Sequence, residues 1–152
     1  MTDLFSLEGK AALVTGGGSG LGQAIAVGLA SAGARVAVTG RDLSKLNETV
    51  NMITETGASA VAIEMDILDS DSVNDAVSRA VEEFGQIDIL VNSAGVHLKK
   101  QTLEVTDEEW TRVIDTNLTG SFRVCRAVAT QMKVQGSGKI INIASLGSFV
   151  AL

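Results

Sequence analysis

A glycine-rich segment that joins a predicted strand to a predicted helix constrains this sequence more than any other feature. The apolar, β-branched stretch 11–15 (AALVT) runs directly into residues 16–22 (GGGSGLG), after which apolar residues recur at helical spacing. Glycine adopts backbone angles that other residues avoid, so main-chain N–H groups in such a loop can approach an anion at the positive start of a helix. The segment therefore predicts a phosphate-binding turn.

The spacing of the glycines narrows the kind of phosphate ligand. Leu21 stands where the third glycine of G-x-G-x-x-G would be, and no Gly-Lys-Ser/Thr follows, so the segment is neither that fingerprint nor a P-loop. From Thr15 onward it has the form T-G-x-x-x-G-x-G. A turn without a ligand is the alternative interpretation, but a position between strand and helix favours the pyrophosphate of a dinucleotide.

Strand-like and helix-like patterns alternate along the chain. Short β-branched stretches are separated by longer stretches whose apolar residues recur at helical spacing. The predicted strands are 11–15, 35–39, 60–65, 87–92 and 139–144. The alternation predicts an α/β fold, a Rossmann-like doubly wound parallel sheet with five strands present, in one dinucleotide-binding domain over residues 1–152.

The longest predicted helix carries apolar residues on more than one face. It begins at a capping box formed by Thr106 and Glu109 and runs to about Lys133. We therefore expect it to pack on the sheet with one side and on another helix or subunit with the other. A weaker helix is predicted near residues 44–56, where apolar positions are few.

The composition excludes several classes of function. Twelve basic and 18 acidic residues give a net charge of −6 without a basic cluster, which argues against nucleic-acid binding. No apolar stretch approaches the roughly 18 residues of a membrane span. A single cysteine, Cys125, and a start without a secretion leader favour the cytoplasm. No cluster of residues has the spacing of metal ligands.

The end of the second predicted strand bears on the choice between nicotinamide cofactors. An acidic residue there binds the ribose 2′-hydroxyl of NAD, and a cation binds the 2′-phosphate of NADP. Gly40 stands where the carboxylate would be, and the guanidinium of Arg41 follows it. The sequence therefore favours NADP(H) over NAD(H). Alternatively, Arg41 is an ordinary solvated arginine and Asp42 a helix cap.

Four short motifs follow the glycine loop in order along the chain. They are DI at 66–67, NSAG at 92–95, DTNLTG at 115–120 and INIAS at 141–145. Together with the loop, they resemble the short-chain dehydrogenase/reductase family of the classical type, over essentially the whole chain. Ser93 departs from the family pattern, which has a second asparagine there.

The resemblance implies an NAD(P)-dependent oxidoreductase in which hydride passes between the nicotinamide and the alcohol or carbonyl carbon of a small molecule. Asp66 could instead cap a turn, and Asn92 could satisfy backbone groups of the sheet. The candidate cofactor-binding residues, with those of the loop, are Gly16, Gly18, Ser19, Gly20, Leu21, Gly22, Arg41, Asp66, Ile67, Asn92, Ala94 and Gly95.

The family uses a serine, an asparagine, a tyrosine and a lysine in catalysis. Ser145 matches the serine that holds the substrate oxygen, and Asn117 matches the asparagine that supports a water relay. The tyrosine falls roughly a dozen residues past the serine in the family, close enough to share one oxygen, and this sequence contains no tyrosine. We therefore expect the amino-terminal part of a longer enzyme, with negligible turnover from this chain alone.

Other functions stay open on sequence alone. A protein that holds NADP(H) without turnover would share the glycine loop and Arg41. A Rossmann protein that binds S-adenosylmethionine would share the loop but leave Asn117 and Ser145 unexplained. The sequence is similar to family members that act on sugar acids or 3-oxoacyl thioesters. Since family members associate through the long helix, we expect a homo-oligomer formed through residues 110–132.

Overall fold

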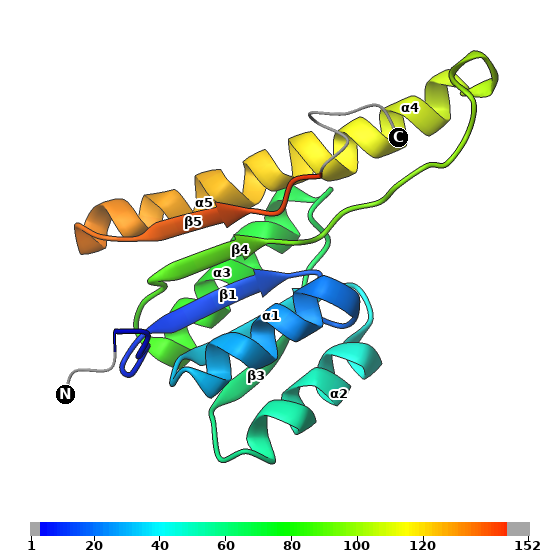
Figure 1. Cartoon of the computed structure of the whole chain (residues 1–152). Helices are drawn as coiled ribbons and strands as arrows, with labels where there is room; N and C mark the ends of the chain where they lie inside the picture. The colour runs from blue at the N-terminus through cyan, green and yellow to red at the C-terminus, as the bar shows by residue number, and fades with distance from the viewer. Residues whose placement is uncertain (1–3, 146–152) are drawn as a thin grey trace.

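Five parallel strands form one sheet in the computed structural model, which describes residues 4–145. The spatial order is β3-β2-β1-β4-β5, so the order reverses between β1 and β4 (Figure 1). The strands are β1 (Ala11–Thr15), β2 (Arg35–Gly40), β3 (Ala60–Glu64), β4 (Ile89–Asn92) and β5 (Lys139–Asn142). The predicted five-stranded, Rossmann-like parallel sheet is confirmed.

Helices cover both faces of the sheet, which makes three layers (Figure 1). Two helices pack over β1 and β2 on one face, around a core that includes Val14, Val36 and Val38. On the other face, two helices enclose a core that includes Leu13 and Leu90. The first pair is α1 (Gly20–Ser31) and α2 (Leu43–Thr54), and the second is α3 (Ser70–Phe84) and α5 (Ser121–Gln135). No helix among the described residues is long and apolar enough to cross a bilayer.

The long helix is interrupted, which the sequence did not predict. Helix α4 (Asp107–Ile114) begins at the predicted capping box, passes into a π-helical segment η2 (Asp115–Gly120), and continues as α5. The helix ends at Gln135, two residues later than predicted, where Gly136 adopts φ +75°. A π-helical turn accommodates one extra residue and leaves no mark in apolar periodicity, so a continuous helix was the natural prediction.

Three of the predicted strands are shorter in the structure. β3 ends at Glu64, one residue earlier than predicted. β4 begins at Ile89 rather than residue 87, because the backbone N–H and C=O of Ile87 bond to the side chain of Gln135. β5 ends at Asn142 rather than residue 144, although Ile143 still donates its N–H to the carbonyl of Asn92.

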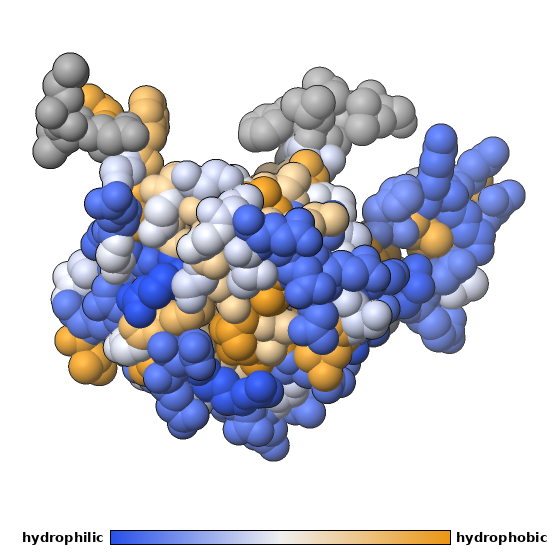
Figure 2. Space-filling model, turned by 90° about the horizontal axis from the view of Figure 1, so that it is seen from below, coloured by the Kyte–Doolittle hydropathy of each residue, from blue (hydrophilic) through white to orange (hydrophobic). Residues whose placement is uncertain are grey.

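Two parts of the described structure lie outside the buried core, namely β5 and the segment around the start of α4. All four residues of β5 are exposed, with Ile141 at 47%, and no other strand among residues 4–145 pairs with its outer edge. The start of α4 and the short helix η1 (Thr102–Glu104) before it stand away from the sheet. In Figure 2 this part forms a hydrophilic lobe beside a face with apolar side chains near its centre.

Asp88 ties the starts of β1 and β4 together. Its carboxylate accepts hydrogen bonds from the N–H of Ala11 at 2.9 Å, from Gln86 at 2.8 Å and from Lys10 at 3.2 Å. Burial raises the pKa of Asp88, but the hydrogen bonds from Ala11, Lys10 and Gln86 and the charge of Lys10 outweigh it and hold that pKa below its ordinary value.

We predict that Asp88→Asn lowers the free energy of unfolding at pH 7 by about 1–3 kcal/mol, because the charged acceptor is lost. Since the pKa of Asp88 is lower in the folded state, its contribution is complete above the ordinary value near 4 and disappears as the pH falls through the folded-state pKa. Urea unfolding should show a difference between wild type and variant at pH 7 that shrinks at pH 3. Asp75→Asn, at an exposed position on α3, is the control and should not show this pattern.

Candidate functional site

The glycine loop after β1 is held in a conformation that requires glycine at two positions. Gly16 has φ +67°, and a Cβ atom there would lie 2.9 Å from the Cα of Ala94. A Cβ on Gly22, in the first turn of α1, would overlap the carbonyl oxygen of Gly16. The loop therefore packs directly against the start of α1 and against the chain after β4, as close backbone approach to a ligand requires.

Two threonines connect this loop to neighbouring parts of the fold. The hydroxyl of Thr15 accepts hydrogen bonds from the N–H groups of Ser93 at 3.1 Å and Ala94 at 3.0 Å. The hydroxyl of Thr49 on α2 donates to the carbonyl of Gly17 at 2.9 Å. Thr49 was not identified from the sequence, because nothing local marks a helix threonine that reaches a loop 32 residues away.

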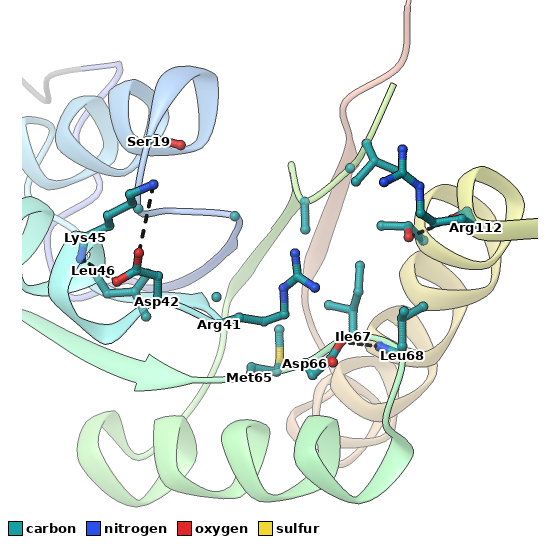
Figure 3. A pocket seen from close by; sticks show the side chains of 17 residues that line it. Ser19, Arg41, Asp42, Lys45, Leu46, Met65, Asp66, Ile67, Leu68 and Arg112 are labelled. Carbon is teal, nitrogen blue, oxygen red and sulfur yellow. Dashed lines mark hydrogen bonds and ion pairs between the residues drawn. The ribbon is translucent and has the colours of Figure 1, made fainter. Parts of the chain in front are cut away.

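A cavity of about 780 Å³ lies at the carboxyl ends of the strands, next to the point where the strand order reverses (Figure 3). That is the position at which open parallel sheets bind ligands, and the volume suits a small organic molecule. Eight of the candidate cofactor-binding residues line it: Gly16, Gly18, Ser19, Arg41, Asp66, Ile67, Ala94 and Gly95. Gly20, Leu21, Gly22 and Asn92 are not among the lining residues, and neither are Asn117 and Ser145.

At the end of β2, a cation enters the cavity and a carboxylate caps the next helix. Arg41 is exposed, extends into the cavity in Figure 3, and forms no ion pair with another described residue. Asp42 accepts hydrogen bonds from the N–H groups of Ser44 at 3.1 Å and Lys45 at 3.3 Å. The alternative interpretation of Asp42 as a helix cap is thus confirmed, while Arg41 keeps a geometry suited to an anion.

At the end of β3, the chain forms a turn that is apolar on its inner side. Asp66 accepts a hydrogen bond from the N–H of Leu68 at 2.9 Å, so it caps this turn and also lines the cavity. Ile67 is 8% exposed and fits against Gly120, where a Cβ atom would come within 2.8 Å of the Ile67 side chain. The glycine of the DTNLTG motif therefore lets η2 approach the wall of the cavity.

Asn92 lies below the cavity, in the sheet. Its side-chain N–H groups donate to the Asn142 side chain at 2.9 Å and to the sulfur of Cys125 at 3.1 Å. The expectation that Asn92 satisfies backbone groups is wrong, because the backbone of β4 is already paired with β1 and β5. Its Oδ1 atom is buried without a partner among the described residues. Asn92 therefore links β4 to β5 and α5 through side chains.

Asn117 and Ser145 occupy different environments. The Asn117 amide accepts from the N–H of Val96 and donates to its carbonyl, both at 2.8 Å, so the side chain holds the segment after β4. Asn117 lies in the π-helical segment η2. Its two bonds to Val96 explain why an asparagine, a poor helix former, stands inside a helix. Ser145 is exposed and follows β5 by three residues.

Several residues that line the cavity were missed by sequence reasoning. They are Lys45, Leu46, Met65, Leu68, Val96, Arg112 and Thr116. Arg112 and Thr116 are one helical turn apart, but which face of α4 meets the cavity depends on tertiary packing. Within residues 4–145, no group of histidine, cysteine and carboxylate side chains could hold a metal ion.

The comparisons with known proteins agree with this architecture. A parallel sheet of this order, with a glycine loop where the order reverses, is the arrangement of Rossmann-type α/β proteins. Residues 10–152 match the family model described as short chain dehydrogenase, and the chain belongs to this family.

Individual relatives are longer than this chain. The 2-dehydro-3-deoxy-D-gluconate 5-dehydrogenase of Escherichia coli is 42% identical over 146 residues, which are 95% of this chain and 57% of that protein. A short-chain type dehydrogenase/reductase from Mycobacterium marinum has a TM-score of 0.95 at 38% identity, covering 99% of this chain and 62% of that one. A variant of actinorhodin polyketide ketoreductase with NADPH has a TM-score of 0.90 at 39% identity, covering 94% and 56%.

We predict that Gly16→Ala destabilises the protein by at least about 1–2 kcal/mol, the cost of a side chain in left-handed backbone. The contact with Ala94 adds to this cost. Gly28→Ala is the matched control, because Gly28 lies in α1 with open space around it and alanine favours a helix. Thermal unfolding of both variants checks the prediction, which fails if Gly16→Ala is as stable as Gly28→Ala.

Proposed function

We propose that this chain forms the cofactor-binding part of an NADP(H)-dependent oxidoreductase that interconverts an alcohol and a carbonyl by hydride transfer. The observation that carries the proposal is the cavity itself, with the glycine loop at one side and the unpaired Arg41 at the end of β2. When bound, the nicotinamide would donate or accept the hydride.

The residues of the cavity fit a dinucleotide. Gly16 and Gly18 leave room for a pyrophosphate beside the loop, where a side chain on Gly16 would press on Ala94. Asp66 and Ile67 would contact the adenine, and Ala94 with Gly95 would line the path toward the nicotinamide. Gly20, Leu21, Gly22 and Asn92 do not line the cavity. Gly22 would act indirectly by letting the loop pack on the start of α1, and Asn92 by linking β4 to β5 and α5.

Arg41 is the residue on which we base the preference for NADP(H). Gly40 next to it has no side chain that could bind a ribose 2′-hydroxyl, and a guanidinium binds phosphate through two parallel N–H groups. The related ketoreductase structure that contains NADPH supports this choice.

We propose Ser145 and Asn117 as the catalytic residues within this chain. Ser145 would hold the oxygen of the substrate. Asn117, whose side chain also holds the segment after β4 through its bonds to Val96, would support a water relay. The acid of the reaction would be the family's tyrosine, which this sequence does not contain. Sugar acids are the first substrates to test on a longer form of the protein, because a relative is named for such a substrate.

We predict that Arg41→Ala weakens NADPH binding by about 1.5–3 kcal/mol, the range for hydrogen bonds to charged groups, with little effect on NADH. Titration calorimetry on this chain with both cofactors measures the difference. Arg126→Ala, on the outer side of α5 above the Phe122 ring, is the control and should bind both cofactors as the wild type does. Equal losses of NADPH and NADH affinity in Arg41→Ala would contradict the assignment of Arg41.

A protein that holds NADP(H) without turnover is the second candidate, because the glycine loop and Arg41 line the cavity whereas Asn117 and Ser145 do not. Turnover of a longer form with NADPH would exclude it, and NADPH binding without turnover by such a form would support it. Tight binding of S-adenosylmethionine in the absence of NADPH binding would overturn both candidates.

We also propose that the protein associates through the outer side of its long helix. Three large apolar side chains of this helix are exposed: Trp110 at 62%, Leu118 at 65% and Phe122 at 57%. Exposure of apolar surface to water costs free energy, which burial in an interface would remove. The double variant Leu118→Ser with Phe122→Ser should sediment as a smaller species than the wild type. Leu43→Ser, at an exposed position on α2, should leave the sedimentation unchanged. A wild type that sediments as a monomer would contradict this proposal.

A further inference from the structure

Arg112 brings a second guanidinium to the cavity, from the side opposite to Arg41. It lies on α4, is exposed and lines the cavity together with Thr116, one helical turn further on. Figure 3 shows Arg41 and Arg112 extending into the cavity from opposite sides, with Ile67 and Leu68 between them. Ser19, in the glycine loop, lies at the far end from Arg112 in the same view.

The acidic neighbours of Arg112 along the helix are engaged with other groups. Glu109, three residues earlier, accepts hydrogen bonds from Lys100 at 2.8 Å and 3.1 Å and from the N–H of Thr106. Asp115 accepts a hydrogen bond from Thr119 at 3.4 Å. Arg112 forms no ion pair with any residue in 4–145, although its charge helps to lower the pKa of Glu109.

The charges around the cavity differ in sign from the charge of the whole chain. Three cations line it, Arg41, Lys45 and Arg112, against the two carboxylates of Asp42 and Asp66. Lys45 lies 3.9 Å from Asp42, and Asp66 caps its own turn. In a chain of net charge −6, this cavity has an excess of positive charge at its edge. Such a cavity suits a ligand that carries negative charge.

The residues around Arg112 indicate which part of the ligand Arg112 contacts. Ile67 and Leu68 give this end of the cavity an apolar wall, whereas the glycine loop, which suits phosphates, is at the other end. A guanidinium beside an apolar wall suits the flat face of an aromatic ring, on which it stacks. This inference rests on the proposed function, since it assigns the base of the bound dinucleotide.

We propose that Arg112 is a cofactor-binding residue that stacks on the purine of the dinucleotide, at the end of the cavity formed by Ile67 and Leu68. The contribution of Arg112 is then the same for NADPH and NADH, because the purine is common to both. It differs in this respect from Arg41, whose contribution depends on the 2′-phosphate.

The test is titration calorimetry on the full chain with Arg112→Gln, which keeps a polar side chain of similar length. We expect the dissociation constants of NADPH and NADH to rise by the same factor, about threefold to thirtyfold, as for loss of a cation–π contact. Arg126→Gln makes the same change of charge on α5, where the guanidinium lies over the Phe122 ring, and should leave both constants unchanged.

Each other outcome overturns the proposal in a recognisable way. Unchanged affinities in Arg112→Gln would show that the side chain does not contact the cofactor. A loss confined to NADPH would place Arg112 on the 2′-phosphate instead of the purine. A wild-type chain that binds neither cofactor would overturn the proposed function itself, and with it this inference.

Discussion

The hydroxyl of Thr15 joins the two halves of the sheet at the place where the strand order reverses. By accepting the N–H groups of Ser93 and Ala94, it brings the end of β4 against the glycine loop that follows β1. Gly16 can then pack on Ala94, and its lack of a side chain becomes a requirement. The cavity, its glycine wall and the segment that Asn117 holds all depend on this contact, because each of them is positioned relative to these two strand ends.

The strands and the phosphate-binding loop could be predicted from the sequence because the patterns that indicate them are local. The stretch AALVT is buried throughout, and the glycines after it stand where backbone approaches backbone. The interruption of the long helix was not accessible, since the reason for it lies in Val96 and Ile67, which are remote in the sequence from η2. Arg112 was missed for the same reason, because a helix arginine is solvated unless tertiary packing turns it toward a cavity.

The position of Asn92 was predicted correctly from the family motif, but its expected contact with backbone groups of the sheet was wrong. The motif NSAG placed it at the end of a strand beside the site, and the structure agrees. Its side chain, however, points into the sheet and connects Asn142 and Cys125. Backbone pairing is already complete on both sides of β4, so the polar amide finds side-chain partners. In this short motif, Asn92 and Ser93 hold the site in place, and Ala94 and Gly95 line the cavity.

The one-sided pairing of β5 divides the site into parts of unequal local stability. The glycine loop and Arg41 follow β1 and β2, which are buried and pair on both edges, so the opening of these two strands requires much of the fold to open. Ser145 follows a four-residue strand that is exposed and joined to β4 alone among residues 4–145. Hydrogen exchange in this chain would therefore be faster along β5 than along β1.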